Sequence, residues 1–417
     1  MSNNTTKPFY NTTIPSDWEV MELLEISNGK ISNGVFNDPK KVGSGYRLIN
    51  VLDLYNEPNI DASKLSLLSI DSKEFERNKV KCGDVFFTRS SLKLEGIAHC
   101  NINLDNREDI TFDGHIMKLS PNQEIIYPKY LRLYCISNLA RQFFMSRAKQ
   151  NTMTTIGQDD ISDMLIPIPP LSEQCAIAHI LSLMDTAINQ NNQLIAQKEL
   201  RKKWLMQNLL TGKKRLKGFG GEWKEIHIRD VSDEVSLRNK EDKQLTVLSC
   251  TKYDGLVESL EYWGRKIFAD DISTYKIVPK NHFAYATNHI EEGSIGYQDS
   301  FDEALISPMY TVFKTDSSIN DLYFYKLLKS HMLIYQYQNR MEGSIDRRGG
   351  LRWDAFSIIK IHLPSYDEQT AIVQVLQAAD KEIQLLKAKT DKLREQKKGM
   401  MQVLLTGKKR LKQDLQD

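Results

Sequence analysis

Apolar residues recur in alternating steps of four and three along two long stretches of this 417-residue chain. The first stretch carries them, with a few polar members, at Ile177, Leu181, Met184, Ile188, Asn191, Ile195, Lys198, Lys202, Leu205 and Leu209. The second carries them at Ile372, Leu376, Ala379, Ile383, Leu386, Thr390, Leu393, Lys397, Met400 and Leu404. Such heptad spacing forms one seam along an α-helix and favours a coiled coil. With about 40 residues each, the stretches predict two helices roughly 60 Å long.

Both predicted helices carry signals for their two ends. Prolines precede each stretch, and a proline stops any helix that runs into it. Ser172 and Asp367 then stand where we expect N-caps, each followed by a glutamate that favours the first turn. Gly212 and Gly407 fall where a residue in the left-handed conformation ends a helix, and basic residues crowd that end. The sequence therefore predicts where both helices begin and end.

The two stretches are copies of one sequence. Residues 171–217 and 366–412 align without a gap at an offset of 195 positions, and 20 of the 47 paired residues are identical, including the run LLTGKKRLK. A repeat of this length defines the architecture of the chain. Asn191 and Thr390 are polar positions that can fix the register of the seam. Two such similar seams favour pairing with each other, and the alternative is that each helix packs only on its own domain.

The repeat continues outside the long helices. Trp18 and Trp223 each open one half of the chain, and a mixed, β-rich region of about 150 residues follows each of them. Both regions contain a strand pattern, VFFT in the first and FAYA in the second. An aromatic helix pattern follows at residues 130–137 and 323–330, and then a polar loop and a last strand lead to the prolines. The order is therefore domain, long helix, domain, long helix.

We expect an α+β protein with two mixed α/β domains and an internal pseudo-two-fold repeat. We divide the chain into a disordered tail at 1–13, a first domain at 14–166, a first long helix at 167–216, a second domain at 217–360, and a second long helix with its tail at 361–417. The apolar runs are too short to span a membrane, and the polar start is not a signal peptide. Five scattered cysteines without CxxC spacing fit a reducing cytoplasm and argue against disulfides or zinc.

Charge is unevenly distributed along the chain. Residues 198–217 carry eight Lys and Arg against one Glu, giving +7, and residues 393–412 carry seven against one, giving +6. Because the net charge is +2, the remainder sums to −11. A uniformly basic nucleic-acid binder is excluded, whereas two concentrated basic helix ends are not. Such ends also complement the helix dipole, so a solvated helix terminus is the alternative explanation.

The sequence contains no catalytic signature. The TGKK segment lacks the upstream glycine and the following Ser or Thr of a phosphate loop, and it lies at a helix C-terminus. There is no Asn-Pro-Pro-aromatic element of the kind that adenine methyltransferases use, and the eight histidines are dispersed. We therefore expect no catalysis, no cofactor and no metal in this chain, and base flipping must come from a partner.

The element PIPPLSEQ…LSLMD…LLTGKKRL, repeated as LPSYDEQ…LQAAD…LLTGKKRL, resembles the specificity subunits of type I restriction–modification enzymes over essentially the whole chain. The resemblance implies two target recognition domains separated by an antiparallel coiled coil, which read a bipartite, asymmetric target in double-stranded DNA. It further implies two modification (methyltransferase) subunits and restriction/translocase subunits as partners in phage defence. S-adenosylmethionine, ATP and magnesium are then expected on those partners. Exposed helix faces and the LLTGKKR ends are candidate surfaces for holding them.

Specific DNA readout requires polar and basic side chains on loops that enter a groove. Candidates in the first domain are Arg89, Ser90, Ser91 and Lys93 after the VFFT strand, and Lys149, Asn151, Thr152 and Thr154 in the later polar loop. Candidates in the second domain are Asn288 and His289 after the FAYA strand, then Arg347, Arg348 and Arg352 around two glycines. A solvated loop side chain is the alternative for each. Replacing both Arg347 and Arg348 with Ala is expected to lower methylation at the second half-target.

A function without DNA is the competing hypothesis. A two-domain coiled-coil scaffold that assembles proteins would share the same helices, and the acidic remainder of the chain is compatible with it. DNA affinity that falls with salt distinguishes the two hypotheses, because phosphate contacts release counterions.

Overall fold

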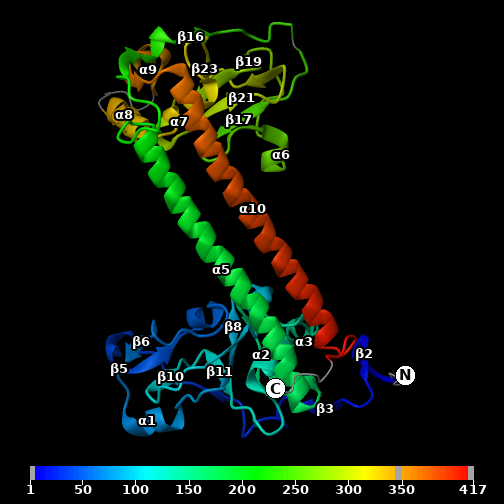
Figure 1. Cartoon of the computed structure of the whole chain (residues 1–417). Coiled ribbons are helices and arrows are strands. Elements are labelled where there is room, and N and C mark those ends of the chain that lie inside the picture. Colours follow the sequence, from blue (N-terminus) through cyan, green and yellow to red (C-terminus); the bar gives the residue numbers. More distant parts are fainter. Residues whose placement is uncertain (1–4, 242, 343–349, 412–417) are drawn as a thin grey trace. The chain divides into compact units, whose positions relative to one another are not determined.

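The computed structural model describes residues 5–241, 243–342 and 350–411. The chain folds as two compact units. Unit 1 comprises Met1–Asn192 with Ala388–Asp417, and unit 2 comprises Gln193–Lys387. Each unit therefore combines one domain with part of both long helices, which are the continuous ribbons α5 and α10 in Figure 1.

The long helices are α5 (Leu171–Leu209) and α10 (Tyr366–Leu404), each of 39 residues, which confirms their predicted lengths. Every residue of the two predicted seams is buried or half-buried, whereas most residues between them are exposed. Burial at heptad spacing is the mark of a coiled-coil seam, so the predicted periodicity is confirmed.

Both ends of each long helix follow local capping chemistry. The predicted N-caps are wrong, because α5 and α10 begin one residue before Ser172 and Asp367. The Glu368 amide instead donates to the Ser365 hydroxyl at 3.4 Å, so the cap precedes the predicted position. The C-terminal prediction is confirmed: a glycine with positive φ, +69° at Gly212 and +65° at the equivalent glycine of the second copy, follows each helix.

Within each unit the two helix segments pair in an antiparallel manner. In unit 1, the Lys397 ammonium lies 2.5 Å from the Asp185 carboxylate, and the Arg394 guanidinium donates to the Asn192 side chain at 3.2 Å. As the residue number rises on α5 it falls on α10, which defines the direction of the pair. In unit 2, the same pattern joins Lys198 with Glu382 and Lys202 with Asp380.

The ends of the seam are also built into the domain cores. In unit 1, Ile177 and Leu181 of α5 and Leu404 and Leu405 near the end of α10 belong to the buried core of the domain. In unit 2, the corresponding core contains Leu209, Leu210, Ile372 and Leu376. The helices therefore pair with each other and also pack on the domains, so the alternative in which each helix packs only on its own domain is wrong.

The repeated glutamate and arginine build a junction in each unit. Glu173, the third residue of α5, accepts from Nε and Nη2 of Arg410, each at 2.7 Å. The Arg410 guanidinium lies over the Trp18 ring, 5.5 Å from its centroid. Gly407 packs against this ring so closely that a Cβ would come within 3.0 Å of it. The LLTGKKR ends are therefore used inside the unit through their leucines, glycine and arginine, while their role as candidate surfaces for partners stays a prediction.

The repeated glutamine ties each long helix to the aromatic helix of its domain. The Gln174 side chain accepts from the Tyr127 amide at 2.7 Å and donates to the Pro169 carbonyl at 2.8 Å. In unit 2, Gln369 accepts from the Asn320 amide at 2.7 Å. Tyr127 and Asn320 are the N-caps of the aromatic helices, so one buried side chain fixes the angle between two helices in each unit.

Unit 1 is a mixed α/β domain with a four-stranded antiparallel sheet in the order β4-β11-β7-β9. Its strands are β1 (Thr6–Phe9), β2 (Thr12–Pro15), β3 (Glu19–Glu22), β4 (Ser32–Asn33), β5 (Val42–Ile49), β6 (Ser66–Leu68), β7 (Val85–Thr88), β8 (Ser90–Ser91), β9 (Cys100–Ile102), β10 (Ile110–Phe112), β11 (Ile116–Leu119), β12 (Lys149–Gln150), β13 (Thr154–Thr155) and β14 (Leu165–Ile168). Its shorter helices are α1 (Ser72–Arg77), α2 (Pro128–Cys135), α3 (Asn138–Arg147) and α4 (Gln158–Ser162), with 3-10 turns η1 (Pro39–Lys41), η2 (Val51–Tyr55) and η3 (Leu94–Gly96).

Unit 2 repeats this plan with a four-stranded sheet in the order β16-β23-β20-β21. Its strands are β15 (Lys224–His227), β16 (Ser232–Val235), β17 (Leu248–Thr251), β18 (Gly255–Glu258), β19 (Lys276–Pro279), β20 (His282–Ala286), β21 (Ile295–Gln298), β22 (Glu303–Ile306), β23 (Tyr310–Thr315) and β24 (Lys360–Leu363). Its shorter helices are α6 (Ser259–Trp263), α7 (Asp321–Leu328), α8 (His331–Glu342) and α9 (Trp353–Ser357), with 3-10 turns η4 (Ile228–Asp230) and η5 (Ile290–Glu292).

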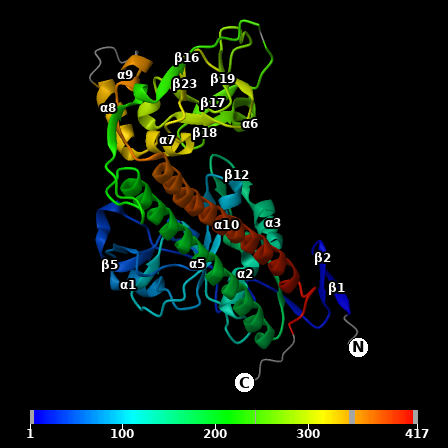
Figure 2. The ribbon, with the colours of Figure 1, turned by 45° about the horizontal axis from the view of Figure 1, so that its top comes forward.

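The shared plan confirms the predicted repeat outside the long helices. The predicted VFFT and FAYA strands are β7 and part of β20, and the predicted aromatic helices are α2 and α7. The last strands, β14 and β24, pair with β3 and β15, which follow the two tryptophans. Figure 2 shows α2 and α3 of unit 1 beside the C-terminal part of α10. Among the described residues, unit 1 has the three-stranded sheet β10-β5-β6, in which β10 and β5 are parallel; unit 2 pairs β17 with β18 and β19 with β22, and its parallel contact is a single bridge between Val247 and Leu305.

The N-terminal segment differs from its prediction. Residues 5–13 were expected to be disordered, but β1 and β2 pair as an antiparallel hairpin in which Phe9 is buried. Phe9 belongs to the main core of unit 1, so one aromatic side chain in a polar stretch orders this segment. Within the described ranges, no helix combines the length and apolar character needed to span a bilayer.

Candidate nucleic-acid interface

The two candidate loops of the first domain meet in one small sheet. Strand β13 pairs with β12 on one side and with β8 on the other, so Thr154 lies opposite Ser91 and Thr155 opposite Ser90. The Ile156 amide also donates to the Arg89 carbonyl at 3.1 Å. Segments about 60 residues apart in sequence therefore present their side chains from a single three-stranded edge, which suits a groove-reading element.

Three cations in or next to the strands of this sheet are exposed. Arg89, Lys93 and Lys149 make no ion pair with any residue that the structure describes. A cation without an ion pair suits a phosphate contact, because it does not have to give up a carboxylate of the protein before it binds DNA. Leu92, which follows β8, and Met153, in the turn between β12 and β13, are exposed at 86% and 42% and offer apolar contact to a base edge.

One candidate of this sheet is not available to DNA. Thr154 is 6% exposed, whereas Thr155 on the same central strand is exposed, because successive residues of a strand point to opposite faces, so Thr154 is not available for a DNA contact. Ser90 and Ser91 are half-buried, whereas Asn151 and Thr152 are exposed at the hairpin tip. A hollow of about 510 Å³ beside the sheet is lined by Arg89 and Lys149 and also by Asp159 and Asp160 of α4. The sheet therefore presents its tip and its cationic edge.

The second domain builds an equivalent edge from different residues. The Leu351 amide donates to the Thr287 carbonyl at 2.9 Å, which matches the hydrogen bond between Ile156 and Arg89 in the first domain. A Cβ on Gly350 would lie 2.5 Å from the Asn288 side chain, so this close approach requires glycine. The loop after β20 and the segment before α9 are thereby brought together.

The cations of this second edge are only partly described. Arg352 is exposed at the N-cap of α9 and forms no ion pair with a described residue. Arg347 and Arg348 lie outside the described residues. Asn288 is half-buried and accepts from the Thr287 hydroxyl at 3.3 Å. Arg352 is therefore the basic side chain that the structure places at this edge.

His289 has acidic neighbours. Its ring and the carboxylates of Glu291 and Glu292 offer ligand atoms that lie within 4.8 Å of one another, the one such cluster among the described residues. His289 and Glu292 are exposed, and exposed acidic groups commonly form such clusters without a metal. The two carboxylates oppose a phosphate at this point, so His289 is a weaker candidate for DNA than Arg352.

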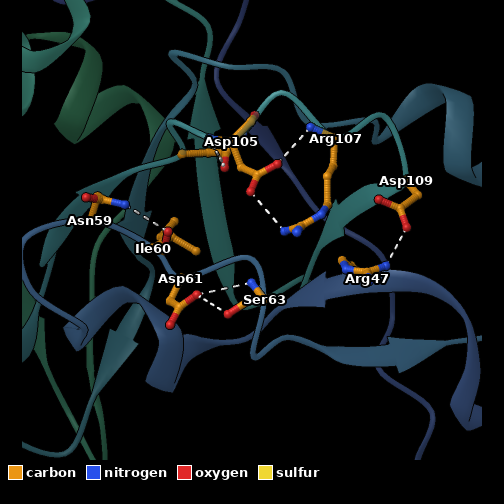
Figure 3. Close-up of polar contacts among 9 residues, drawn as sticks. Arg47, Asn59, Ile60, Asp61, Ser63, Asp105, Arg107 and Asp109 are labelled. Atoms are coloured by element: carbon orange, nitrogen blue, oxygen red, sulfur yellow. Dashed lines mark hydrogen bonds and ion pairs between the residues drawn. The ribbon is translucent and has the colours of Figure 1, made fainter.

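Other arginines of the first domain are committed to carboxylates. In Figure 3, the Arg107 guanidinium donates to Asp105 at 2.9 Å, and the Arg47 guanidinium to Asp109 at 2.5 Å. Asp61 holds the nearby loop by accepting from Ser63, which lowers the pKa of the Asp61 carboxyl to about 2. These contacts order the loops around β5 and β10, and both guanidinium groups are already paired with a carboxylate.

Sequence reasoning missed a pair of equivalent grooves on the long helices. In unit 1, a groove of about 320 Å³ is lined by the α2–α3 junction, by the Asp185–Lys397 pair, and by Lys398 and Gln402. In unit 2, a groove of about 1280 Å³ is lined by the α7–α8 junction, by the Asp380–Lys202 pair, and by Lys203 and Gln207. These helix residues correspond at the repeat offset of 195, and that offset was the signal that could have found them.

The groove of unit 2 is the more cationic. Lys203 and Lys213 are exposed there without an ion pair to a described residue. The Lys329 ammonium is buried without a hydrogen-bond partner, and burial lowers the pKa of this lysine. Two lysines, Lys202 and Lys326, instead bind Asp380 and lower its pKa, although burial by itself would raise that pKa. The groove therefore favours an acidic or polar partner surface.

Comparisons with known proteins agree with this architecture. The chain is 26% identical over 415 residues to the protein assigned as the type I restriction enzyme MjaX specificity subunit of Methanocaldococcus jannaschii, covering 96% of this chain and 95% of that one. It is 24% identical over 178 residues to the EcoKI specificity subunit of Escherichia coli, covering 40% and 37% of the two chains.

Solved structures share the fold. The crystal structure of the HsdS subunit from Thermoanaerobacter tengcongensis aligns with a TM-score of 0.53 and 17% identity, covering 94% of this chain and 98% of that one. The type I S subunit from M. genitalium aligns with a TM-score of 0.54 and 14% identity, covering 96% and 98%. The pattern of the type I restriction modification DNA specificity domain matches residues 15–199 and again residues 221–395. The chain therefore belongs to the type I restriction–modification DNA specificity family and carries two copies of its specificity domain.

Proposed function

We propose that the two edges described above read the two halves of one bipartite DNA target, each through its own loops. As a DNA specificity subunit of a type I restriction–modification complex, the chain is non-catalytic. One observation carries the proposal: the two units have equivalent sheets, but the loops at the equivalent edges carry different residues. Arg89 in unit 1 and Thr287 in unit 2, for example, accept the equivalent backbone hydrogen bond. Different side chains at equivalent edges read different bases, so the half-targets differ.

In the first half-target, Arg89, Lys93 and Lys149 contact phosphates or guanine edges, while Ser90, Ser91, Asn151 and Thr152 hydrogen-bond to bases. Support comes from their common sheet and from the absence of ion pairs between the three cations and other described residues. In the second half-target, Asn288, His289 and Arg352 act together with Arg347 and Arg348, which lie outside the described residues.

The partner arrangement follows from the repeat. We propose that each groove on the long helices holds one modification subunit, which gives two copies per chain. The grooves are equivalent at the repeat offset and both expose lysine and glutamine, at Lys398 and Gln402 in unit 1 and Lys203 and Gln207 in unit 2. Restriction/translocase subunits join this assembly. The partner subunits bind S-adenosylmethionine, ATP and magnesium, and the complex works in the cytoplasm.

The test is base-resolution methylation sequencing of a host that carries the chain with its methyltransferase partner. The expected result is methylation at one motif of two different half-sites separated by a fixed spacer. The proposed readout would be overturned if methylation depended on the chain but occurred at scattered sites without a common motif. A salt-dependent gel shift of the complex on genomic fragments checks DNA affinity independently of methylation. The scaffold hypothesis predicts no such shift, and the family match does not support it.

A further inference from the structure

The position just before β11 in unit 1 and its equivalent in unit 2 both stand beside the candidate base-reading loops. In unit 1, the Arg89 amide donates to the carbonyl of His115 at 3.0 Å. In unit 2, the Thr287 hydroxyl donates to the carbonyl of Met309 at 3.1 Å. The sheet register makes these positions equivalent, because Thr88 lies opposite Ile116 in unit 1 as Ala286 lies opposite Tyr310 in unit 2.

The histidine is held in one orientation by a buried carboxylate. Asp113 Oδ1 lies 2.8 Å from His115 Nδ1 and also accepts from the His115 amide at 2.7 Å. The Asp113 side chain is 7% exposed, whereas the His115 side chain is 67% exposed. A carboxylate only accepts, so in the neutral tautomer that fits this contact Nδ1 carries the hydrogen and Nε2 is the acceptor. A ring fixed in this way loses little conformational freedom on binding.

The surroundings of His115 provide room for an incoming base edge. A hollow of about 400 Å³ is lined by His115 and Asp113 together with Asn50, Ser66 and Lys64. Asn50 donates to the Ser66 hydroxyl at 3.0 Å, so the polar wall of the hollow is ordered. The His115 residue thus lines this hollow and accepts from the Arg89 amide through its backbone carbonyl.

Met309 offers different chemistry at the equivalent place. It is 62% exposed and has no strong hydrogen-bonding group, so it suits the methyl group of thymine. His115 Nε2 suits an exocyclic amine of adenine or cytosine. We propose that this pair of equivalent positions reads one base in each half-target, by a hydrogen bond in unit 1 and by apolar contact in unit 2. The proposal rests on the proposed function, because it assigns residues to the same DNA-reading edges.

The experiment uses the complex of the full chain with its methyltransferase partner on DNA libraries randomised at each position of both half-targets. His115→Ala is expected to relax one position of one half-target by about ten-fold, the scale of a single base contact. Met309→Ala is expected to relax one position of the other half-target by a smaller factor. Asp113→Ala, which removes the acceptor that holds His115 Nδ1 but leaves the ring in place, is expected to fall between wild type and His115→Ala.

Lys64→Ala is the control, since it lines the same hollow but pairs with Asp61. Unfolding temperature and affinity for non-target DNA report whether each variant folds. If His115→Ala and Met309→Ala keep wild-type preferences at every position, this inference is wrong while the proposed function stands. If the wild-type complex itself shows no bipartite preference, the proposed function fails first.

Discussion

Arg410 and Glu173, which lie 237 positions apart in the chain, form a two-point ion pair in which Nε and Nη2 each donate to one carboxylate oxygen at 2.7 Å. The carboxylate is almost fully buried, with 3% of the side chain exposed, while 30% of the arginine side chain is exposed. In unit 2, Arg215 and Glu368 form the same contact with both distances at 2.5 Å. An arginine that follows the C-terminal end of one long helix thus anchors the first turn of the other.

Arg410→Met is expected to destabilise unit 1 by about 3 kcal/mol, because it leaves the Glu173 carboxylate buried without its partner. The lower end of the usual range is appropriate because the arginine is partly exposed. Chemical denaturation of the full chain measures the loss. Lys409→Met is the matched control, since Lys409 is exposed and unpaired among the described residues. Equal stability of the two variants would show that the ion pair is dispensable.

His99 is expected to make the stability of unit 1 depend on pH. Burial, followed by the nearby Arg141 guanidinium, lowers the pKa of His99 from its ordinary value of 6.5. The ring stacks on Tyr55 at 4.4 Å, and its Nε2 is buried without a partner. Well above pH 6.5 the His99 ring is neutral in both the folded and the unfolded chain, so its contribution to the free energy of unfolding is fully present. As pH falls below 6.5, the unfolded chain takes up a proton first and the free energy of unfolding decreases.

The variant His99→Phe preserves an aromatic ring beside Tyr55 and removes the titration. Its free energy of unfolding, measured by denaturant between pH 5 and 7, is expected to fall less with acidification than that of the wild type. His179→Gln, a change at an exposed histidine of α5, serves as the control and should leave the wild-type pH dependence in place. Identical pH profiles for wild type and His99→Phe would argue against a role for His99.

Arg89→Ala and Lys149→Ala are expected to weaken DNA binding and to reduce its salt dependence. Each lost phosphate contact lowers the slope of log affinity against log salt by about 1. Gel shifts of the complex at several salt concentrations measure that slope. Arg107→Ala is the control, because its guanidinium is already paired with Asp105. An unchanged slope in Arg89→Ala would place this residue away from the DNA backbone.

Lys203→Glu and Lys398→Glu are a matched pair at equivalent positions of the two grooves. Each is expected to remove one modification subunit from the complex, because reversing a charge in an interface costs affinity through like-charge contact. Native mass spectrometry counts the subunits, with one copy expected in either variant and none in the double variant. Two retained copies in both single variants would locate the docking surface elsewhere.

The repeated parts of the fold were predictable from the sequence, and the unrepeated parts were not. Heptad spacing predicted the helices α5 and α10, and the offset of 195 positions predicted that the sheets around them repeat, because both are regular patterns that can be read along the sequence. The predicted N-caps Ser172 and Asp367 were wrong because these residue types are common N-caps, whereas each helix begins one residue earlier. At the start of α10 the Ser365 hydroxyl accepts from the Glu368 amide instead. The buried state of Thr154 follows from a pairing between β13 and β8 that spans about 60 residues, which no local pattern encodes. His115 gained its candidate role only through Asp113 and the register of β11.

Both long helices contain residues of both units, so their length is expected to set the spacing between the two half-targets. Removing one heptad from each helix shortens both by roughly 10 Å at 1.5 Å per residue. B-DNA advances 3.4 Å per base pair, so the non-specific spacer is expected to lose about three base pairs while both half-sites stay the same.

Methylation sequencing of the host carrying the shortened chain measures the spacer directly. Deletion from one helix only is the control, because it breaks the antiparallel register seen at Asp185 and Lys397 and is expected to abolish methylation altogether. A shortened chain that methylates the original spacer would mean that the helices do not set the distance. A change in the half-sites would mean that the loops and the helices are not independent, which the separation of repeated and unrepeated elements argues against.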